Sequence, residues 1–180
     1  IYLSLILRPN IAPRSAPSMT LLTAVAIAET LLAVPGLEIA IKWPNDILAR
    51  GKKLAGILTE MSTTGESIDY AVVGLGLNVN TSRFPDEIED RATSILIETG
   101  QRVRRVTLAK EYLKWHEEYY DVFQRIGFEP IRKRWKELTN MMGQQVTVET
   151  IGREYTGKVQ DIDDGGALIL RDETSGYHRV

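Results

Sequence analysis

The chain has 180 residues, of which 43% are hydrophobic and 26% are charged, and its formal net charge is −2 at pH 7. These values are ordinary for a soluble globular protein, and the near-neutral charge leaves no electrostatic footprint for nucleic acid. With no cysteine and two histidines, the chain excludes disulfides, thiolate metal sites and cysteine nucleophiles, and it argues against a histidine-rich metal centre. The most apolar stretch, residues 21–34, includes Glu29 and is too short to cross a bilayer, so we expect a cytoplasmic protein.

The first half of the chain predicts several strands around one buried helix. The expected elements are a strand over 1–8, a helix over 18–34, and strands over 37–43, 47–49, 54–60 and 70–77. Pro9 ends the first strand and Pro35-Gly36 ends the helix. Because chain ends are seldom buried in a strand, we expect Ile1 to continue a longer domain whose upstream part is missing here.

The second half predicts helices and then a small all-β unit. The expected elements are a partly helical stretch over 84–98, helices over 107–127 and 129–139, and strands over 145–150, 154–161 and 167–171. The composition changes after Asn140, and Asp163-Asp164-Gly165-Gly166 reads as a hairpin connection. We therefore expect an α+β fold, with a mixed sheet flanked by helices over residues 1–140 and a small SH3-like β-barrel over residues 141–180.

The densest polar cluster is Lys42-Trp43-Pro44-Asn45-Asp46, at the end of a predicted strand. Lysine supplies positive charge, while asparagine and aspartate supply the oxygen ligands that a hard cation such as Mg²⁺ prefers. The cluster therefore suits a site for phosphate and magnesium. An ordinary polar turn explains the same residues about equally well.

Lys53 lies in the strand that follows this cluster. If Ala49-Arg50 forms a two-residue hairpin loop, Asp46 stands directly opposite Lys53, at the ~5 Å spacing of cross-strand pairs. Alternation then puts Lys53 and Ala55 on one face and Gly56 on the other, where a ligand can approach the bare backbone. The alternative is a solvated hairpin tip, in which the basic residues simply keep a strand edge soluble.

A third candidate is Gly74-Leu75-Gly76-Leu77-Asn78. Two alternating glycines leave one strand face bare, so that a flat ring can lie on it, and the Asn78 amide matches the donor and acceptor pattern of adenine. This pattern differs from the dinucleotide fingerprint, because no third glycine and helix follow. A β-bulge or tight packing against the helix is the alternative interpretation.

Taken together and in this order, the three motifs resemble the catalytic domain of biotin–protein ligases. The features are the Lys-Trp-Pro-Asn-Asp cluster, the lysine seven residues after its aspartate in Lys-Leu-Ala-Gly-Ile-Leu, and Gly-Leu-Gly-Leu-Asn. Residues 1–9 resemble the strand that follows the family's glycine- and arginine-rich loop, and residues 142–180 are similar to its SH3-like C-terminal domain. The resemblance implies a fold related to class II aminoacyl-tRNA synthetases, with that loop lying before Ile1.

The resemblance also implies the roles of individual residues. Lys53 and Asp46 would be catalytic, and Lys53, Gly56 and Leu58 would bind biotin. The residues implied for ATP binding are Lys42, Asn45, Asp46, Gly74, Gly76 and Asn78, with Asp46 also holding Mg²⁺.

The activity implied is the ATP-dependent formation of biotinyl-5'-AMP and transfer of biotin to a lysine of a biotin carboxyl carrier protein. A homodimer is expected. A ligase for lipoate or octanoate is one alternative, and a biotin-responsive transcriptional repressor is another. DNA would be a partner if a helix-turn-helix domain precedes Ile1, and activity of this chain alone is open because the loop over the ligands is absent.

Overall fold

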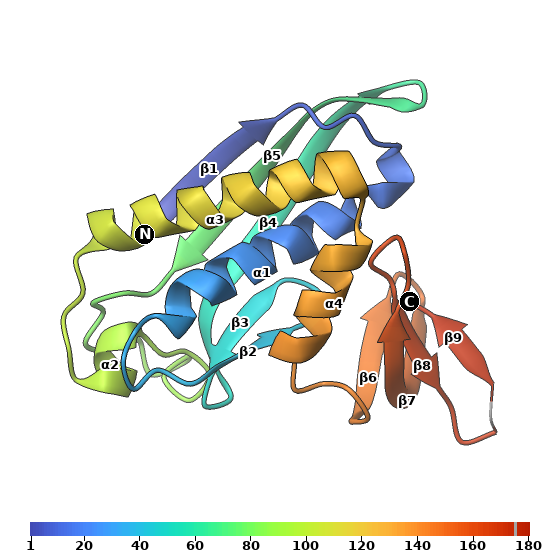
Figure 1. Cartoon of the computed structure of the whole chain (residues 1–180). Coiled ribbons are helices and arrows are strands. Elements are labelled where there is room, and N and C mark those ends of the chain that lie inside the picture. The colour runs from blue at the N-terminus through green and yellow to red at the C-terminus, as the bar shows by residue number, and fades with distance from the viewer. Residues whose placement is uncertain (175) are drawn as a thin grey trace.

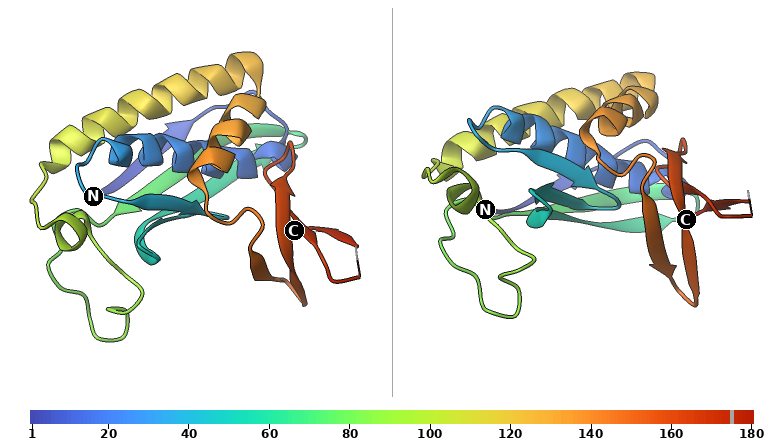
Figure 2. Two further views of the ribbon diagram at one scale, coloured as in Figure 1. Left: turned by 60° about the horizontal axis from the view of Figure 1, so that its bottom comes forward. Right: turned by 90° about the horizontal axis from the view of Figure 1, so that it is seen from below.

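The computed structural model describes residues 1–174 and 176–180, and its main body is a five-stranded sheet with helices packed on one face (Figures 1 and 2). The strands are β1 (Tyr2–Leu7), β2 (Ile39–Lys42), β3 (Asp46–Ala49), β4 (Lys52–Thr64) and β5 (Ser67–Leu77). Their order across the sheet is β1-β5-β4-β3-β2, and each neighbouring pair is antiparallel. Two isolated parallel bridges, Ile41 with Thr139 and Lys53 with Ala92, join other segments to it.

Three helices cover one face of this sheet (Figure 2). They are α1 (Pro17–Leu32), α3 (Arg105–Ile126) and α4 (Glu129–Leu138), and a short 3₁₀ turn, η1 (Pro13–Ser15), precedes α1. The stretch Pro13–Leu32 has the length and hydropathy of a membrane span, but 72% of its most apolar window is buried inside the fold. Its apolar composition is therefore explained by its place between the sheet and the other two helices.

The stretch between β5 and α3 is partly helical, as the sequence predicts for residues 84–98. Helix α2 covers Ile95–Thr99, and residues 84–94 form turns and extended backbone. The Ser94 hydroxyl accepts from the Ile97 backbone N–H, so Ser94 caps the helix and marks its start. Before the cap, the backbone bonds to β4 instead: the Lys53 N–H donates to the Arg91 carbonyl, and the Thr93 N–H donates to the Lys53 carbonyl.

The C-terminal part forms a separate four-stranded antiparallel sheet (Figure 1). Its strands, in spatial order, are β6 (Gln145–Thr150), β7 (Arg153–Ile162), β8 (Leu168–Arg171) and β9 (Tyr177–Arg179). The hairpin over residues 163–166 connects β7 to β8, as the sequence predicts. Closure of this sheet into an SH3-like barrel, and the domain boundary at residues 140/141, stay predictions.

Candidate active site

The uncovered face of the large sheet holds most of the residues singled out in the sequence. Alternation sends Leu75 and Leu77 toward the helices, where both are 3% exposed, and leaves Gly74 and Gly76 on the open face. Gly76 pairs with Gly56 on β4, so three glycines form a low floor at the middle of the sheet. A hollow of about 380 Å³ lies over this floor. Its lining residues are Tyr2, Leu3, Ser4, Asn45, Lys53, Gly56, Ile57, Leu58, Gly74, Leu75 and Gly76.

Lys53 and Asp46 form an ion pair at the rim of this hollow. The Lys53 Nζ lies 2.6 Å from Asp46 Oδ1, and the two side chains are 51% and 22% exposed. The predicted contact is present, but the register behind it was wrong. The turn falls at Arg50-Gly51, where both residues have positive φ, and Asp46 pairs with Gly56 instead of Lys53.

A β-bulge explains how the two side chains still meet. Ile47 pairs with Ala55 and Leu48 with Lys53, which leaves Leu54 as the extra residue. The bulge breaks the alternation, so Lys53 lies on the same face as Gly56, contrary to the sequence prediction. A Cβ on Gly56 would lie 2.9 Å from Lys53 Cε, which shows how closely the lysine passes over that glycine.

A second hollow, of about 580 Å³, opens on the other side of Lys53. Its lining residues are Lys42, Asp46, Leu48, Gly51, Lys53, Ile88, Asp90, Arg91 and Ala92. Lys53 thus borders both hollows, with its ammonium group held by Asp46 between them. An ammonium group fixed between two cavities can stabilise negative charge that develops where two bound molecules meet.

The backbone of Lys53 is fixed from outside its own hairpin. Its N–H lies 2.7 Å from the Arg91 carbonyl, and its carbonyl lies 2.9 Å from the Thr93 N–H. Thr93 is held in turn, because its carbonyl accepts from the Asn78 side-chain amide at 3.1 Å and its hydroxyl donates to Glu98 at 2.6 Å. These contacts restrict the motion of Lys53 before any ligand arrives.

Asn45 anchors the polar cluster to β4. Its side-chain amide donates to the Ile57 carbonyl at 2.8 Å, and its own carbonyl accepts from the Ile57 N–H at 2.9 Å. Lys42 stands opposite Asp46 in the β2–β3 pairing and borders the second hollow. The cluster is therefore a short, doubly anchored strip that presents Lys42 and Asp46 to one hollow and Asn45 to the other.

The structure groups the predicted residues differently from the sequence. Gly74 and Gly76, expected to shape an adenine pocket, form the floor of the first hollow together with Gly56, and Leu58 lines the same hollow. Asn78 directly follows β5, and its side-chain amide N–H donates to the Thr93 carbonyl.

Sequence reasoning missed several lining residues. Tyr2 and Ser4 belong to the glycine floor because they pair with Gly76 and Gly74 across β1 and β5. The alternating pattern of β1, with leucines at positions 3, 5 and 7, already indicated that these two residues face the other side. Asp90 and Arg91 come from a loop with no local pattern that points to the site.

The carboxylates around the second hollow bear on whether this site suits magnesium. Within residues 1–174 and 176–180 no group of three or more histidine, cysteine, aspartate or glutamate side chains is arranged to hold a metal ion. Mg²⁺ is commonly held by one or two carboxylates together with the phosphates of a nucleotide. Asp46 and Asp90, which border the same hollow, fit that smaller requirement.

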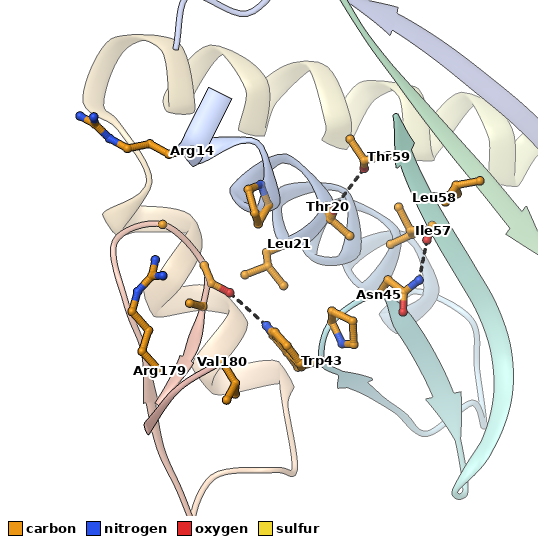
Figure 3. A pocket seen from close by; sticks show the side chains of 15 residues that line it. Arg14, Thr20, Leu21, Trp43, Asn45, Ile57, Leu58, Thr59, Arg179 and Val180 are labelled. Atoms are coloured by element: carbon orange, nitrogen blue, oxygen red, sulfur yellow. Dashed lines mark hydrogen bonds between the residues drawn. The ribbon is translucent and has the colours of Figure 1, made fainter. Parts of the chain in front are cut away.

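A third hollow, of about 460 Å³, lies between the large sheet and the C-terminal sheet (Figure 3). Trp43, Pro44 and Asn45 form one side of it, and Gly165 and Gly166 lie on the other. The Trp43 indole Nε1 donates to the Gly166 carbonyl at 3.0 Å. The polar cluster is therefore in direct contact with the C-terminal sheet.

Comparisons with known proteins match both parts of the chain. Residues 1–78 match the model of the biotin/lipoate A/B protein ligase family, and residues 142–177 match that of the biotin protein ligase C terminal domain. The chain is 38% identical to the bifunctional ligase/repressor BirA of Bacillus subtilis (strain 168), over 94% of this chain and 53% of that protein. It is 35% identical to the biotin–[acetyl-CoA-carboxylase] ligase of Paracoccus denitrificans, over 93% of this chain and 72% of that protein.

A solved structure agrees with these matches. The biotin protein ligase from Aquifex aeolicus in complex with biotin and ATP superimposes with a TM-score of 0.86 at 26% identity, covering 99% of this chain and 74% of that one. The fold, with its helix-flanked sheet, is thus that of biotin protein ligases, as expected. The chain spans about half the length of the BirA relatives that it matches.

Proposed function

Because the chain belongs to the biotin/lipoate A/B protein ligase family, we propose that it is the catalytic and C-terminal part of a biotin–protein ligase. The proposed enzyme joins biotin to the AMP part of ATP, which gives biotinyl-5'-AMP and releases pyrophosphate, and then transfers the biotin to a lysine of a biotin carboxyl carrier protein. The family matches and the similarity to a ligase solved with biotin and ATP support this proposal.

The observation that carries the proposal is the position of Lys53 between two hollows. The hollow over the glycine floor is the proposed biotin site, with Lys53, Gly56 and Leu58 as biotin-binding residues. Gly74 and Gly76 share this floor, so we assign them to the space where biotin and the nucleotide join. The larger hollow, on the far side of Lys53, is the proposed site for the ATP phosphates.

The chemistry explains why a fixed lysine is needed there. A biotin carboxylate oxygen attacks the α-phosphorus of ATP, a P–O bond forms, and pyrophosphate leaves with the electrons of the broken bond. Both reactants are negatively charged, and an ammonium group held in place lowers the cost of bringing them together. Asp46 orients Lys53 across 2.6 Å, so the group does not need to reorganise during the reaction.

ATP would be bound together with Mg²⁺. Asp46 is proposed as the protein ligand of Mg²⁺, and Lys42 and Asn45 as residues that hold the phosphates. Magnesium bound in this way neutralises phosphate charge. Asn78 is proposed to contact the adenine edge through its amide oxygen, since its amide N–H is bonded to Thr93.

In the second step the amine of a carrier lysine attacks the biotinyl carbonyl, the C–O bond to phosphate breaks, and AMP leaves. Either the carrier or a second copy of the chain needs a place to dock. Beyond Gly56, β4 pairs with β5 alone among the described strands, so the β3-side edge of residues 58–64 is free. A free edge of this kind supports the proposed homodimer by strand-to-strand pairing.

Isotopic exchange between pyrophosphate and ATP tests the proposed function. The protein with its natural termini should catalyse exchange that depends on biotin and should show little with lipoate or octanoate. A lipoate or octanoate ligase would show the opposite preference. The match of residues 142–177 to the biotin ligase C-terminal model favours biotin.

A repressor role is a second candidate, favoured by relatives that are named bifunctional ligase/repressor. DNA would be bound outside residues 1–180, so the test is whether the protein with its natural termini binds DNA when supplied with biotin and ATP. We also propose a cytoplasmic location, because the most apolar helix of this chain is part of the core.

A further inference from the structure

The contact between Trp43 and the C-terminal sheet lies close to the reacting groups. The Trp43 indole donates a 3.0 Å hydrogen bond to the Gly166 carbonyl, drawn as a dashed line from Trp43 in Figure 3. Residues 43–45 form a turn that leads directly into Asp46, the first residue of β3. Asn45 is bonded to β4 and Asp46 to Lys53. Asn45 and Asp46 follow Trp43 by two and three residues, so a displacement of Trp43 should also move them.

Gly166 is built for close approach. Its φ is +87°, which favours glycine, and a Cβ there would lie 3.0 Å from Leu21 Cδ1 and 3.3 Å from the Ser18 backbone nitrogen. The hairpin backbone thus rests directly on the first turns of α1. This packing fixes where the Gly166 carbonyl points, and it points at Trp43.

The hairpin that carries this carbonyl is itself rigid. Asp163 Oδ1 accepts hydrogen bonds from the Gly165 and Ala167 backbone N–H groups, both at 2.9 Å, and Oδ2 is paired with Arg179. Asp163 loses solvent through partial burial, which opposes the charged form, but these hydrogen bonds outweigh that effect and lower the pKa of its carboxyl group. The charged carboxylate therefore holds the loop closed at neutral pH.

Other contacts hold the C-terminal sheet in place independently of Trp43. The Arg132 guanidinium on α4 lies 2.8 Å from Asp161 Oδ2, and Lys136 Nζ lies 3.0 Å from Asp161 Oδ1. Helix α4 is itself fixed to the large sheet, because its C-cap residue Thr139 donates from its hydroxyl to the Ile41 carbonyl on β2 at 2.8 Å. Loss of the single indole hydrogen bond should therefore leave the two sheets docked.

We propose that Trp43 is a positioning residue through which the C-terminal hairpin sets the geometry of Asn45 and Asp46 for adenylate formation. The proposal rests on the proposed ligase function and adds a role in the first half-reaction for the C-terminal sheet. In this role the sheet holds the polar cluster in register with Lys53, and it does so through a backbone carbonyl and an indole N–H.

The test is Trp43→Phe, which keeps an aromatic ring and removes the N–H donor, in the protein with its natural termini. We expect kcat for biotin-dependent pyrophosphate exchange to fall about tenfold, because small misplacements of reacting groups reduce rates strongly. The KM for biotin and the melting temperature should stay near those of the wild type. Trp115→Phe is the matched control, because Trp115 stacks on Tyr119 on α3, away from the site.

A second variant acts from the other side of the same contact. Gly166→Ala should displace the hairpin from α1 and reproduce the fall in kcat while Trp43 is intact. In ¹⁵N-indole spectra, the Trp43 N–H should be protected from solvent exchange in the wild type and should lose that protection in Gly166→Ala. This readout is independent of activity and applies even where Trp43→Phe does not fold.

The possible results distinguish failure of the positioning role of Trp43 from failure of the proposed ligase function. A wild-type protein without biotin-dependent exchange would remove the proposed function. An active wild type whose Trp43→Phe variant exchanges pyrophosphate at the normal kcat would overturn the positioning role. Normal exchange combined with slower transfer to the carrier would also overturn it, because that result would make Trp43 a carrier contact.

Discussion

The two faces of the five-stranded sheet are made from the same strands, but they differ in burial and in the size of their side chains. On β5, Leu75 is buried beneath the helices, while the adjacent Gly76 forms part of an open floor. On β4, Ile57 is 2% exposed and Leu58 is 62% exposed. The covered face is packed with large apolar side chains that stabilise the fold, and the open face has glycines where the proposed biotin site lies.

This contrast teaches that function and stability are separated residue by residue along each strand. Neighbouring positions point to opposite faces, so a substitution on one face should change catalysis and the next substitution should change stability.

The largest effect is expected on the open face, at Lys53. Lys53→Ala should lower biotinyl-AMP formation by about 10²–10³-fold, the usual cost of removing an electrostatic donor at a transition state. The folded state should survive, since the lysine side chain is half exposed. Pyrophosphate exchange measures the rate and thermal melting measures the fold.

Lys52→Ala is the matched control for this prediction. Lys52 is the preceding residue, and its ammonium group reaches the Glu89 carbonyl at 3.2 Å, without bordering either hollow. If both lysine variants lost activity equally, general positive charge on the hairpin would explain the site, and a specific role for Lys53 would be wrong.

The next prediction compares adjacent residues on β5. Leu75→Ala should reduce the free energy of unfolding by about 2–4 kcal/mol, because it leaves a cavity beneath the helices. Gly76→Ala should change stability much less, since its new Cβ would meet Tyr2 at an ordinary 3.6 Å. Urea unfolding and the KM for biotin are the two measurements.

The expected pattern is crossed: Leu75→Ala lowers stability with KM nearly unchanged, and Gly76→Ala raises KM with stability nearly unchanged. A Gly76→Ala variant that unfolds as easily as Leu75→Ala would show that the open face is also part of the stabilising core.

Gly56→Ala should lower kcat by about tenfold. The added Cβ would lie 2.9 Å from Lys53 Cε and 3.1 Å from Nζ, so the lysine must move away from Asp46. The atoms that move are the flexible end of a side chain, and stability should therefore change little. Steady-state pyrophosphate exchange separates kcat from KM.

Gly74→Ala gives the comparison for Gly56→Ala. Its Cβ would lie 3.6 Å from the Leu58 carbonyl and 3.9 Å from the Ser4 hydroxyl, away from the lysine. Its effect should appear in the KM for biotin and not in kcat. Identical kinetic changes in the two variants would contradict the idea that Gly56 gives Lys53 its space.

The sequence predicted the covered face well because that face depends on local patterns. Alternating leucines mark β1, and the apolar run with Pro35-Gly36 after it marks α1 to within two residues at either end. The Lys53–Asp46 contact was also predicted, although from the wrong turn and without the bulge at Leu54. The bulge depends on how β4 pairs with β3, and no local sequence pattern predicts that pairing.

The rest of the site depends on long-range pairing. Tyr2 reaches the glycine floor only through its register with Gly76, and the Arg91 carbonyl fixes Lys53 from a loop 38 positions further along the chain. Residues 84–98 were predicted to be partly helical, and α2 confirms this for residues 95–98. The helix does not extend further back, because the backbone of Arg91 and Thr93 bonds to Lys53 on β4, a tertiary contact that no local pattern indicates.

The last prediction concerns the effect of pH beneath the covered face, at His116 on α3. The ring is 3% exposed and lies 3.3 Å from the Thr23 hydroxyl, between the rings of Tyr112 and Tyr120, and burial lowers the pKa of His116 to about 4. The unfolded chain takes up a proton near pH 6.5, and the folded chain resists it until about pH 4. The stability that neutral His116 contributes is therefore fully present above pH 6.5, and it is lost as the pH falls from 6.5 to about 4.

Each pH unit within this window costs about 1.4 kcal/mol for one proton, so unfolding at pH 5 should require ~2 kcal/mol less than at pH 7 from this residue. His116→Gln should show a shallower decline in urea unfolding between these two pH values. The matched control is His178→Gln, which removes the other histidine and leaves His116 in place. Equal pH dependence in the wild type and His116→Gln would mean that His116 does not resist protonation, and that the covered face is less closed to water than its packing indicates.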